Sequence, residues 1–183
     1  MSMAENLPQW KNPLPLRLVP SDDSESFRTL PPDATALPLA PHPGAYGVQR
    51  KNHVHEGIDL YCPAGTAVQA VEAGTVVAII PFTGAQAGSD WWENTDAVLV
   101  EGASGVVVYG EIAPVCKTGD ALAAGDTVGH VVTVLKKDKG RPMAMLHLEL
   151  HARGARDAPE WPRPDKKPAT LRDPTPFLKQ VAE

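Results

Sequence analysis

The sequence predicts an all-β protein, a compact antiparallel barrel or sandwich-like sheet with a groove. Short runs rich in β-branched residues follow one another along the middle of the chain, and glycines separate them. No helical amphipathic pattern of about ten residues lies between these runs, so neighbouring strands should pair antiparallel. The 19 prolines and 15 glycines supply the turns that such a sheet needs. The runs are TAVQAVEAG, TVVAII, AVLVEG, GVVVYGEI, DTVGHVVTVL and MLHLELH.

The chain divides into three parts by composition. Residues 1–43 hold many of the prolines and the acidic run SDDSES, without helical or strand periodicity, so we expect an extended Pro-rich arm packed on the core. Residues 44–154 carry the strand runs and should form the β domain. Residues 155–183 are again rich in proline and should form a tail with one short terminal helix.

The start of that helix can be placed from local residues. Asp173 followed by Pro174 is typical of an N-cap and a first helical residue. Trp161 and Phe177 are the apolar residues best suited to anchor the tail on the barrel.

Composition excludes several classes of function. The net charge of −5 and the pI near 5.7 offer no basic surface to a phosphate backbone, so nucleic acid is not expected as a partner. No run of about eighteen apolar residues and no secretion-signal pattern occurs, so neither a membrane span nor a Sec signal is expected. Cys62 and Cys116 are too few for a disulfide framework, and the sequence leaves open whether they are bonded.

The segment NHVHEGIDLYCPAGTAVQAVEAGTVV contains a candidate metal site. His55 and Asp59 lie an even number of residues apart, so an extended backbone points both side chains the same way. Gly57 between them leaves room where the two side chains would converge. These two residues alone predict either a metal site or a hydrogen-bonded pair.

A second polar cluster lies in MLHLELH, which alternates strictly. Its leucines should face the core, whereas Met145, His147, Glu149 and His151 should face a groove. One histidine from this strand would complete a His/Asp/His set with an open fourth position, the arrangement of catalytic zinc. The alternative is a solvated strand face with incidental polar residues.

Three segments in order resemble the M23 (LytM, lysostaphin-like) zinc endopeptidases. The first segment, HEGIDL followed by PAGTAVQAVEAGTV, resembles their H-x-G-x-D motif and the G-T-P-V-x-A-x-x-x-G-x-V that follows it. The second segment, VVVYGEIAPVCKTGDALAAGDTVGHV, resembles their Y-A-H-L segment and the following G-D-x-V-x-x-G-x-x-I-G. The third segment, MLHLELHARG, resembles their H-L-H-F-E strand. The resemblance covers about residues 44 to 154. It implies the compact β fold of that family and one zinc ion held by His55, Asp59 and His147. It also implies a peptidoglycan or peptide substrate and a place of action that is usually outside the cytoplasm.

Two positions depart from the family pattern. Active members carry a histidine in the Y-A-H-L segment and another at the start of H-x-H, and here these positions hold Glu111 and Met145. A thioether can neither accept a proton nor stabilise an oxyanion, but a carboxylate can act as general base, so Glu111 is the candidate catalytic residue. His151 and His53 are candidate substitute donors that could reach the groove, where His151 would also bind substrate; the alternative is that each is a surface histidine.

Other residues are candidates for substrate binding. Tyr109 shares the strand period of Glu111 and should therefore face the same groove. Trp91 and Trp92 lie in a Gly-rich loop and should either wall that groove or fill the core.

Two functions follow from these residues. The retained ligand set favours a zinc-dependent peptidase acting on peptidoglycan or related peptides. The missing histidines favour a catalytically degenerate domain that keeps zinc and binds a peptide or a partner protein. A lipoyl- or biotinyl-type carrier domain is a weaker possibility, because GDALAAGDTVG resembles its hairpin but no carrier lysine motif follows.

Overall fold

The computed structural model describes residues 7–183 and shows a mostly β protein, as predicted. In the described part of the chain, a large antiparallel sheet of nine strands is accompanied by a parallel pair. The large sheet comprises β3 (Ile58–Tyr61), β4 (Ala67–Gln69), β5 (Gly74–Thr83), β6 (Thr95–Gly102), β7 (Gly105–Pro114), β8 (Ala121–Leu122), β9 (Thr127–Val131), β10 (Met145–His151) and β11 (Leu171–Arg172).

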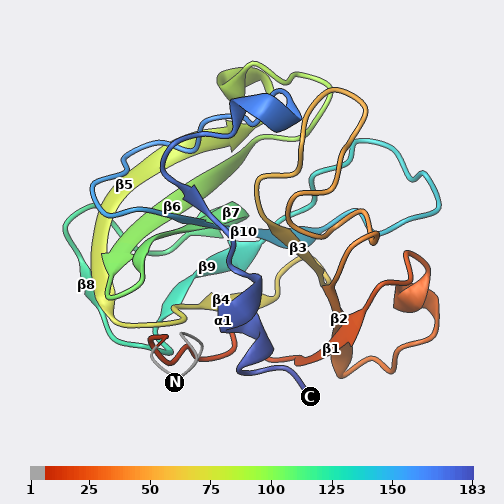
Figure 1. The fold of residues 1–183 in the computed structure, drawn as a ribbon, viewed down its shortest axis with the longest axis horizontal. Helices are drawn as coiled ribbons and strands as arrows, with labels where there is room; N and C mark the ends of the chain where they lie inside the picture. The colour runs from red at the N-terminus through yellow and green to blue at the C-terminus, as the bar shows by residue number, and fades with distance from the viewer. Residues whose placement is uncertain (1–6) are drawn as a thin grey trace.

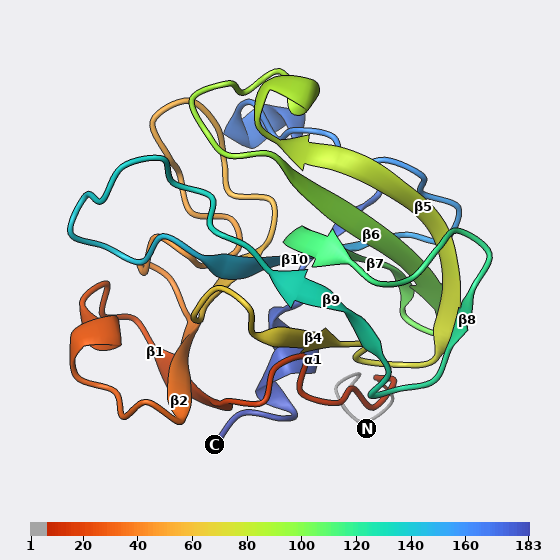
Figure 2. The ribbon, with the colours of Figure 1, turned by 180° about the vertical axis from the view of Figure 1, so that it is seen from behind.

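The sheet curves around β10, which runs through the middle of the molecule in Figures 1 and 2. The main path of hydrogen-bonded strands is β11-β10-β7-β6-β5-β8. β10 also pairs with β3, and β9 bridges β7 and β4. β10 therefore has three strand partners, and the side chains on it are placed by all of them.

The main core lies on one face of the central strands. Leu146, Leu148 and Leu150 of β10 are all buried there, which confirms the predicted leucine face. Tyr109 of β7 and Ile58 of β3 belong to the same cluster. A smaller apolar cluster, which includes Ala97, Leu99, Val106 and Val108, lies on the other face of β6 and β7.

The N-terminal arm contains regular structure that the sequence analysis did not predict. β1 (Arg17–Ser21) and β2 (Ala34–Pro38) form a parallel two-stranded sheet, joined by a segment with a 3₁₀ turn at Ser26–Arg28. The arm was expected to be extended, and in these ranges it is extended and also paired. Both runs are short and contain prolines, which masks a strand period, and only their packing against β3 and the core favours pairing.

Trp10 attaches the arm to the rest of the protein. Its side chain is 1% exposed, and its ring stacks on Phe177 with centroids 4.7 Å apart. The indole N–H lies 3.1 Å from Glu72 Oε1 and 2.9 Å from Ser104 Oγ. The arm and the C-terminal tail thus meet at the stacked rings of Trp10 and Phe177. The buried indole N–H of Trp10 is satisfied by its hydrogen-bond partners Glu72 and Ser104.

The tail ends in the short helix α1 (Thr175–Lys179), one residue later than predicted. Asp173 Oδ1 accepts a hydrogen bond from the Thr175 N–H, so Asp173 does satisfy a free donor at the helix start. Trp161 packs on Tyr46 with ring centroids 5.7 Å apart. Across the described residues, no helix is long and apolar enough to span a membrane. Cys62 and Cys116 are free thiols.

Replacing Trp10 by alanine should lower the free energy of unfolding by about 3–5 kcal/mol, because it removes a buried ring and leaves the Glu72 carboxylate with fewer partners. Chemical denaturation measures the change. Trp91, whose side chain is 63% exposed, provides the matched control, and its alanine variant should stay within about 0.5 kcal/mol of wild type. Equal effects in the two variants would contradict the anchoring role of Trp10.

Candidate metal centre

His55 is held in place by the segment that precedes β3. Its backbone N–H donates to the Val48 carbonyl at 3.0 Å, and its carbonyl accepts from the Gly47 N–H at 2.9 Å. The ring Nδ1 lies 2.9 Å from the Ala45 carbonyl, which is an acceptor and therefore places the proton on Nδ1. Nε2 is buried and makes no hydrogen bond of good geometry, and its one polar neighbour is Asp59 Oδ1 at 3.2 Å. A lone pair held in this way can bind a metal ion.

Asp59 and His147 meet because β3 and β10 pair in register. The two residues are Cα partners in the antiparallel ladder. His147 Nδ1 lies 2.9 Å from Asp59 Oδ1, and His55 Nε2 lies 3.2 Å from the same oxygen. The ligand atoms of His55, Asp59 and His147 all lie within 4.8 Å of one another, and all three residues are buried. The predicted His/Asp/His group is thus assembled, and it could hold a metal ion.

Arg50, which the sequence analysis did not consider, orients the aspartate. Its Nη2 lies 2.7 Å from Asp59 Oδ2 and also donates to the Pro43 carbonyl. The guanidinium therefore occupies Oδ2 and leaves Oδ1 for the two histidines. No spacing rule connects residues 50 and 59, so only the fold reveals this contact.

Burial and the neighbouring groups shift the pKa values of Asp59 and His147 in opposite directions. Burial favours the neutral form of Asp59, but the nearby His55 and His147 imidazoles hold its pKa well below the usual range. Burial would likewise lower the pKa of His147, but hydrogen bonds to Asp59 and Glu149 raise it well above the usual value. In the metal-free protein His147 is therefore a cation between two carboxylates, and a metal ion must displace a proton from it.

Gly57 has a different role from the one expected. A Cβ at this position would lie 2.4 Å from the Leu148 carbonyl oxygen and 3.0 Å from Glu149 Cγ. The glycine thus permits close approach of the β3 segment to the β10 backbone, rather than clearing space between His55 and Asp59. Any larger residue would push His55 away from His147, because both are tied to these two segments.

Glu111 lies at a break in the β6–β7 ladder. Gly110 pairs with Ala97 and Ile112 pairs with Asp96, so Glu111 is an extra, bulged residue. Its φ of 65° is the left-handed conformation, and among the described residues it is the one non-glycine residue with positive φ. Such a conformation costs about 1 kcal/mol or more and is concentrated at functional sites.

The Glu111 side chain is buried, with 9% of its surface exposed, and its Oε2 has no hydrogen-bond partner. Burial, followed by the negative charge of Asp59, raises the pKa of Glu111 to about 8. His147 acts in the opposite direction. Gly110, the residue before Glu111, is the Cα partner of the candidate ligand His147 in the β7–β10 ladder, so Glu111 follows directly on the position opposite His147.

Tyr109 does not face the same side as Glu111, so that prediction is wrong. Tyr109 is Leu148's partner in the ladder and lies fully buried in the leucine core, where its hydroxyl accepts from the Val71 N–H at 2.9 Å. The bulge at Glu111 changes the parity of β7, so that Ile112 takes the next core position. A strict alternation rule cannot anticipate an inserted residue.

The polar face of β10 is covered rather than open. His147, Glu149 and His151 are 5%, 2% and 0% exposed. The expectation that His151 reaches a substrate groove is therefore wrong, because Glu149 and Thr170 enclose both of its ring nitrogens. Alternation predicts a face correctly but does not show what lies against it.

An aromatic side chain missed by sequence reasoning borders the site. The Phe82 ring lies 5.2 Å from the His147 ring, centroid to centroid, and a Cβ at Gly110 would collide with it at 2.6 Å. Phe82 thus packs against His147 at one side of the candidate metal centre. Met145, at the other departure from the family pattern, is half-buried and pairs with Tyr61 of β3.

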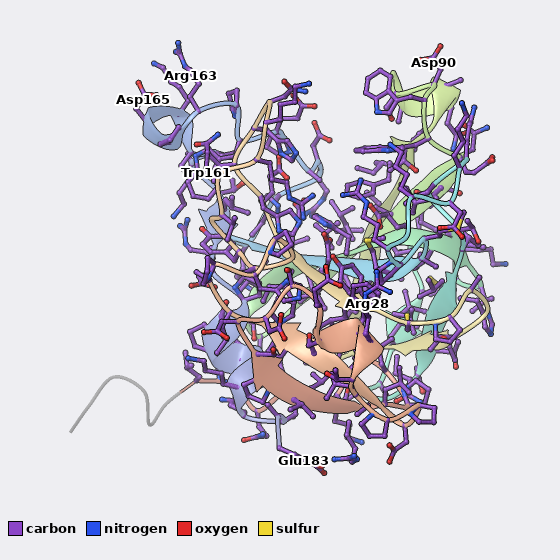
Figure 3. All side chains as sticks on the ribbon, turned by 90° about the vertical axis from the view of Figure 1, so that its right-hand side faces the viewer. Arg28, Asp90, Trp161, Arg163, Asp165 and Glu183 are labelled. Carbon is purple, nitrogen blue, oxygen red and sulfur yellow. The ribbon has the colours of Figure 1, made fainter. Side chains whose placement is uncertain are left out.

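The remaining candidates lie elsewhere. His53 Nδ1 lies 3.1 Å from Glu56 Oε1, and the same oxygen accepts a hydrogen bond from the backbone N–H of Trp161. Trp91 and Trp92 border a cavity of about 360 Å³ together with Leu135 and three lysines of the loop 136–139. No metal-ligand candidate lines this cavity, and substrate binding by the tryptophans stays a prediction. Figure 3 shows Asp90 and Trp161 on separate projections at one end of the molecule.

The fold and this group of residues define a class: a mostly β protein whose curved sheet brings together two histidines and an aspartate able to hold a metal. The model of peptidase family M23 matches residues 53–159, and the chain belongs to this family. No curated protein matches the chain.

Solved structures with similarity to the chain have low sequence identity to it. The catalytic domain of the antimicrobial peptidase lysostaphin from Staphylococcus simulans is 21% identical over 74% of this chain and 87% of that one, with a TM-score of 0.49. CbpA from L. salivarius REN is 20% identical over 75% and 85%, with a TM-score of 0.48. A mutant catalytic domain of the prophage-encoded M23 protein EnpA from Enterococcus faecalis is 24% identical over 67% and 87%, with a TM-score of 0.45.

Glu111→Gln should stabilise the metal-free protein in a pH-dependent way. Because the pKa of Glu111 is raised from 4.5 to about 8 on folding, its contribution to stability is fully present below about pH 4.5 and is lost as the pH rises to about 8. Glutamine stays neutral throughout. We therefore expect the free energies of unfolding to coincide near about pH 4 and to differ by about 2 kcal/mol or more near about pH 8, in favour of glutamine.

Urea denaturation at both pH values, with metal removed by a chelator, measures this difference. Glu160, which is exposed, supplies the control, and Glu160→Gln should give the same small difference at both pH values. If Glu111→Gln changed the free energy of unfolding by the same amount at both pH values, ionisation of the Glu111 carboxyl would not destabilise the folded protein.

Proposed function

We propose that the protein is a zinc-dependent peptidase that hydrolyses peptide bonds of peptidoglycan or related peptides, with Glu111 as general base. The observation that carries this proposal is Glu111 itself, whose carboxyl is buried without a partner for Oε2, whose backbone is strained, and which follows Gly110, the ladder partner of His147. Strain and an unpaired buried acid both cost stability, and such features are retained where they serve catalysis.

The donor set fits zinc. Two imidazole nitrogens and one carboxylate oxygen are a frequent catalytic zinc set, with a fourth position left open. Ligand atoms bound to one tetrahedral zinc lie about 3.3 Å apart, close to the 2.9 and 3.2 Å that separate Asp59 Oδ1 from the histidine nitrogens. His55 Nε2 has no other partner. When bound, zinc would supply a Lewis acid that acidifies water and polarises a peptide carbonyl.

Glu111 and Phe82 would supply the other contributions to catalysis. Glu111 would accept a proton from the attacking water and deliver it to the leaving amine. Beside a divalent cation the ionised form of Glu111 is favoured, which brings its pKa down toward the range of a working base. Phe82 would exclude bulk water from one side and so strengthen the local electrostatic interactions.

The substrate class is inferred from membership of peptidase family M23 and from the motifs around the ligands. Peptidoglycan peptides are the expected substrates of such a domain. Trp91 and Trp92 remain candidate contacts for the peptide or the attached glycan, since Trp91 is exposed, Trp92 is half-buried, and aromatic rings suit both ligands.

A second candidate is a binding module that keeps the metal but does not cleave. The observation that favours it is the absence of imidazole at the two family positions held here by Glu111 and Met145. Arg50 adds to this case, because its ion pair with Asp59 occupies the second oxygen of a metal ligand. Turnover separates the two candidates.

Purified protein should carry about one zinc ion per chain, and His147→Ala should lose most of it on dialysis. Elemental analysis measures the content. His130 is an exposed histidine of β9 and is the matched control, so His130→Ala should keep the full content. Full metal content in the dialysed His147→Ala protein would contradict the ligand assignment.

Hydrolysis should fall by about 10²- to 10⁴-fold in Glu111→Gln, the range typical for loss of a general base, while zinc content is unchanged. Release of new amines from purified sacculi and from glycine-rich peptides measures turnover. Met145→His should raise activity only if the site lacks an imidazole that it needs. A fully zinc-loaded wild type inactive on both substrates from about pH 5 to 9 would favour the binding module instead.

A further inference from the structure

A chain of hydrogen bonds, buried except for its partly buried last member, runs from the candidate metal ligand His147 to the C-terminal tail. His147 Nε2 lies 2.8 Å from Glu149 Oε1, and His151 Nε2 lies 2.7 Å from Glu149 Oε2. His151 Nδ1 lies 2.8 Å from Thr170 Oγ1. The proposed function uses neither Glu149 nor His151, although both are almost completely buried.

The chemistry of the carboxylate decides the direction of these bonds. Each oxygen of Glu149 lies within hydrogen-bond distance of one imidazole nitrogen, and a carboxylate can only accept hydrogen bonds. Each of its oxygens therefore requires an N–H donor, which is Nε2–H on both His147 and His151. With its proton held on Nε2, His147 can present an Nδ1 lone pair toward Asp59 and a metal ion.

Thr170 of the C-terminal tail forms the far end of this chain of hydrogen bonds. Thr170 precedes β11, which pairs with Leu150 and His151, and the Thr170 carbonyl accepts from the Ala152 N–H at 2.7 Å. Its hydroxyl can donate to His151 Nδ1, which keeps the His151 proton on Nε2, opposite Glu149. Thr170 lies beyond the residues 53–159 that match the family model. The tail thus contributes a group that the matched domain lacks.

We propose that Glu149, His151 and Thr170 position His147 for metal binding, so that the C-terminal tail takes part in forming the metal centre. The inference rests on the metal site proposed above. Glu149 is the direct partner of the ligand, and the other two residues act through it. Partners of this kind orient a ligating histidine, select its tautomer and raise its basicity.

Zinc affinity of the full chain, measured by competition with a chromophoric chelator, tests the proposal. We expect about 10- to 100-fold weaker binding in Glu149→Gln, because an amide cannot accept from both histidines. Thr170→Val should weaken binding less, by about three- to tenfold, and Thr170→Ser should restore wild-type affinity because it keeps the hydroxyl. Glu72→Gln is the matched control, since it neutralises another buried, hydrogen-bonded carboxylate far along the chain. It should leave zinc affinity unchanged.

Ring ¹⁵N chemical shifts give a second measurement that a general loss of stability would not alter. In the zinc-loaded wild type His147 should carry its proton on Nε2, and in metal-free Glu149→Gln both tautomers of the neutral His147 ring should appear at high pH. In the metal-free wild type His151 should be protonated on Nε2. A His151 without that proton, or unchanged affinity and tautomer in Glu149→Gln, would overturn the proposal.

Two further outcomes separate this inference from the proposed function. Wild type that takes up no zinc would overturn the metal site, whereas the His151 measurement would still decide whether the hydrogen-bond chain exists. Two zinc ions per chain, one of them lost in Glu149→Gln, would overturn the positioning role. Glu149 would then itself be a ligand in the Glu56, His147 and Glu149 group, whose ligand atoms also lie within 4.8 Å.

Discussion

The antiparallel pairing of β3 with β10 is the constraint on which the candidate site depends. This register makes Asp59 and His147 direct partners and places Leu60 and Leu148 in the core on the opposite face. A shift by one residue would exchange the two faces and bury the ligands among the leucines. The apolar core and the metal centre therefore require the same register, and the free energy of burying the leucines holds the ligands in place.

The polar side of that pairing is a closed network and not an open strand face. Arg50 holds one oxygen of Asp59, and Glu149 holds the far nitrogen of His147. Each partner restricts its ligand to one orientation. In a buried setting such contacts are stabilising only when every member is satisfied, and the His55 Nε2 and Glu111 Oε2 atoms are not. Both atoms belong to residues of the proposed site, and the proposed zinc ion and substrate water would supply their missing partners.

The strand positions and the ligands could be predicted because both depend on local periodicity. MLHLELH alternates, the leucines are in the core, and His147 meets His55 and Asp59 as expected. Periodicity failed where the chain departs from it. The bulge at Glu111 separated it from Tyr109, and the prolines of the arm concealed β1 and β2. His151 was assigned to a groove because alternation shows which side a residue faces but not what covers that side.

The sequence by itself determined the fold class, the family and the three metal-ligand candidates, since each depends on residue types at short and regular spacings. Tertiary structure alone decided the environment of those ligands. Arg50, Phe82 and Thr170 reach the site from three separate segments, and no spacing within the sequence links them to it. The pKa of Glu111 likewise depends on burial and on Asp59, which lies far away along the chain. Contacts between segments that are distant in the sequence place these groups, and these contacts form only when the whole sheet has folded.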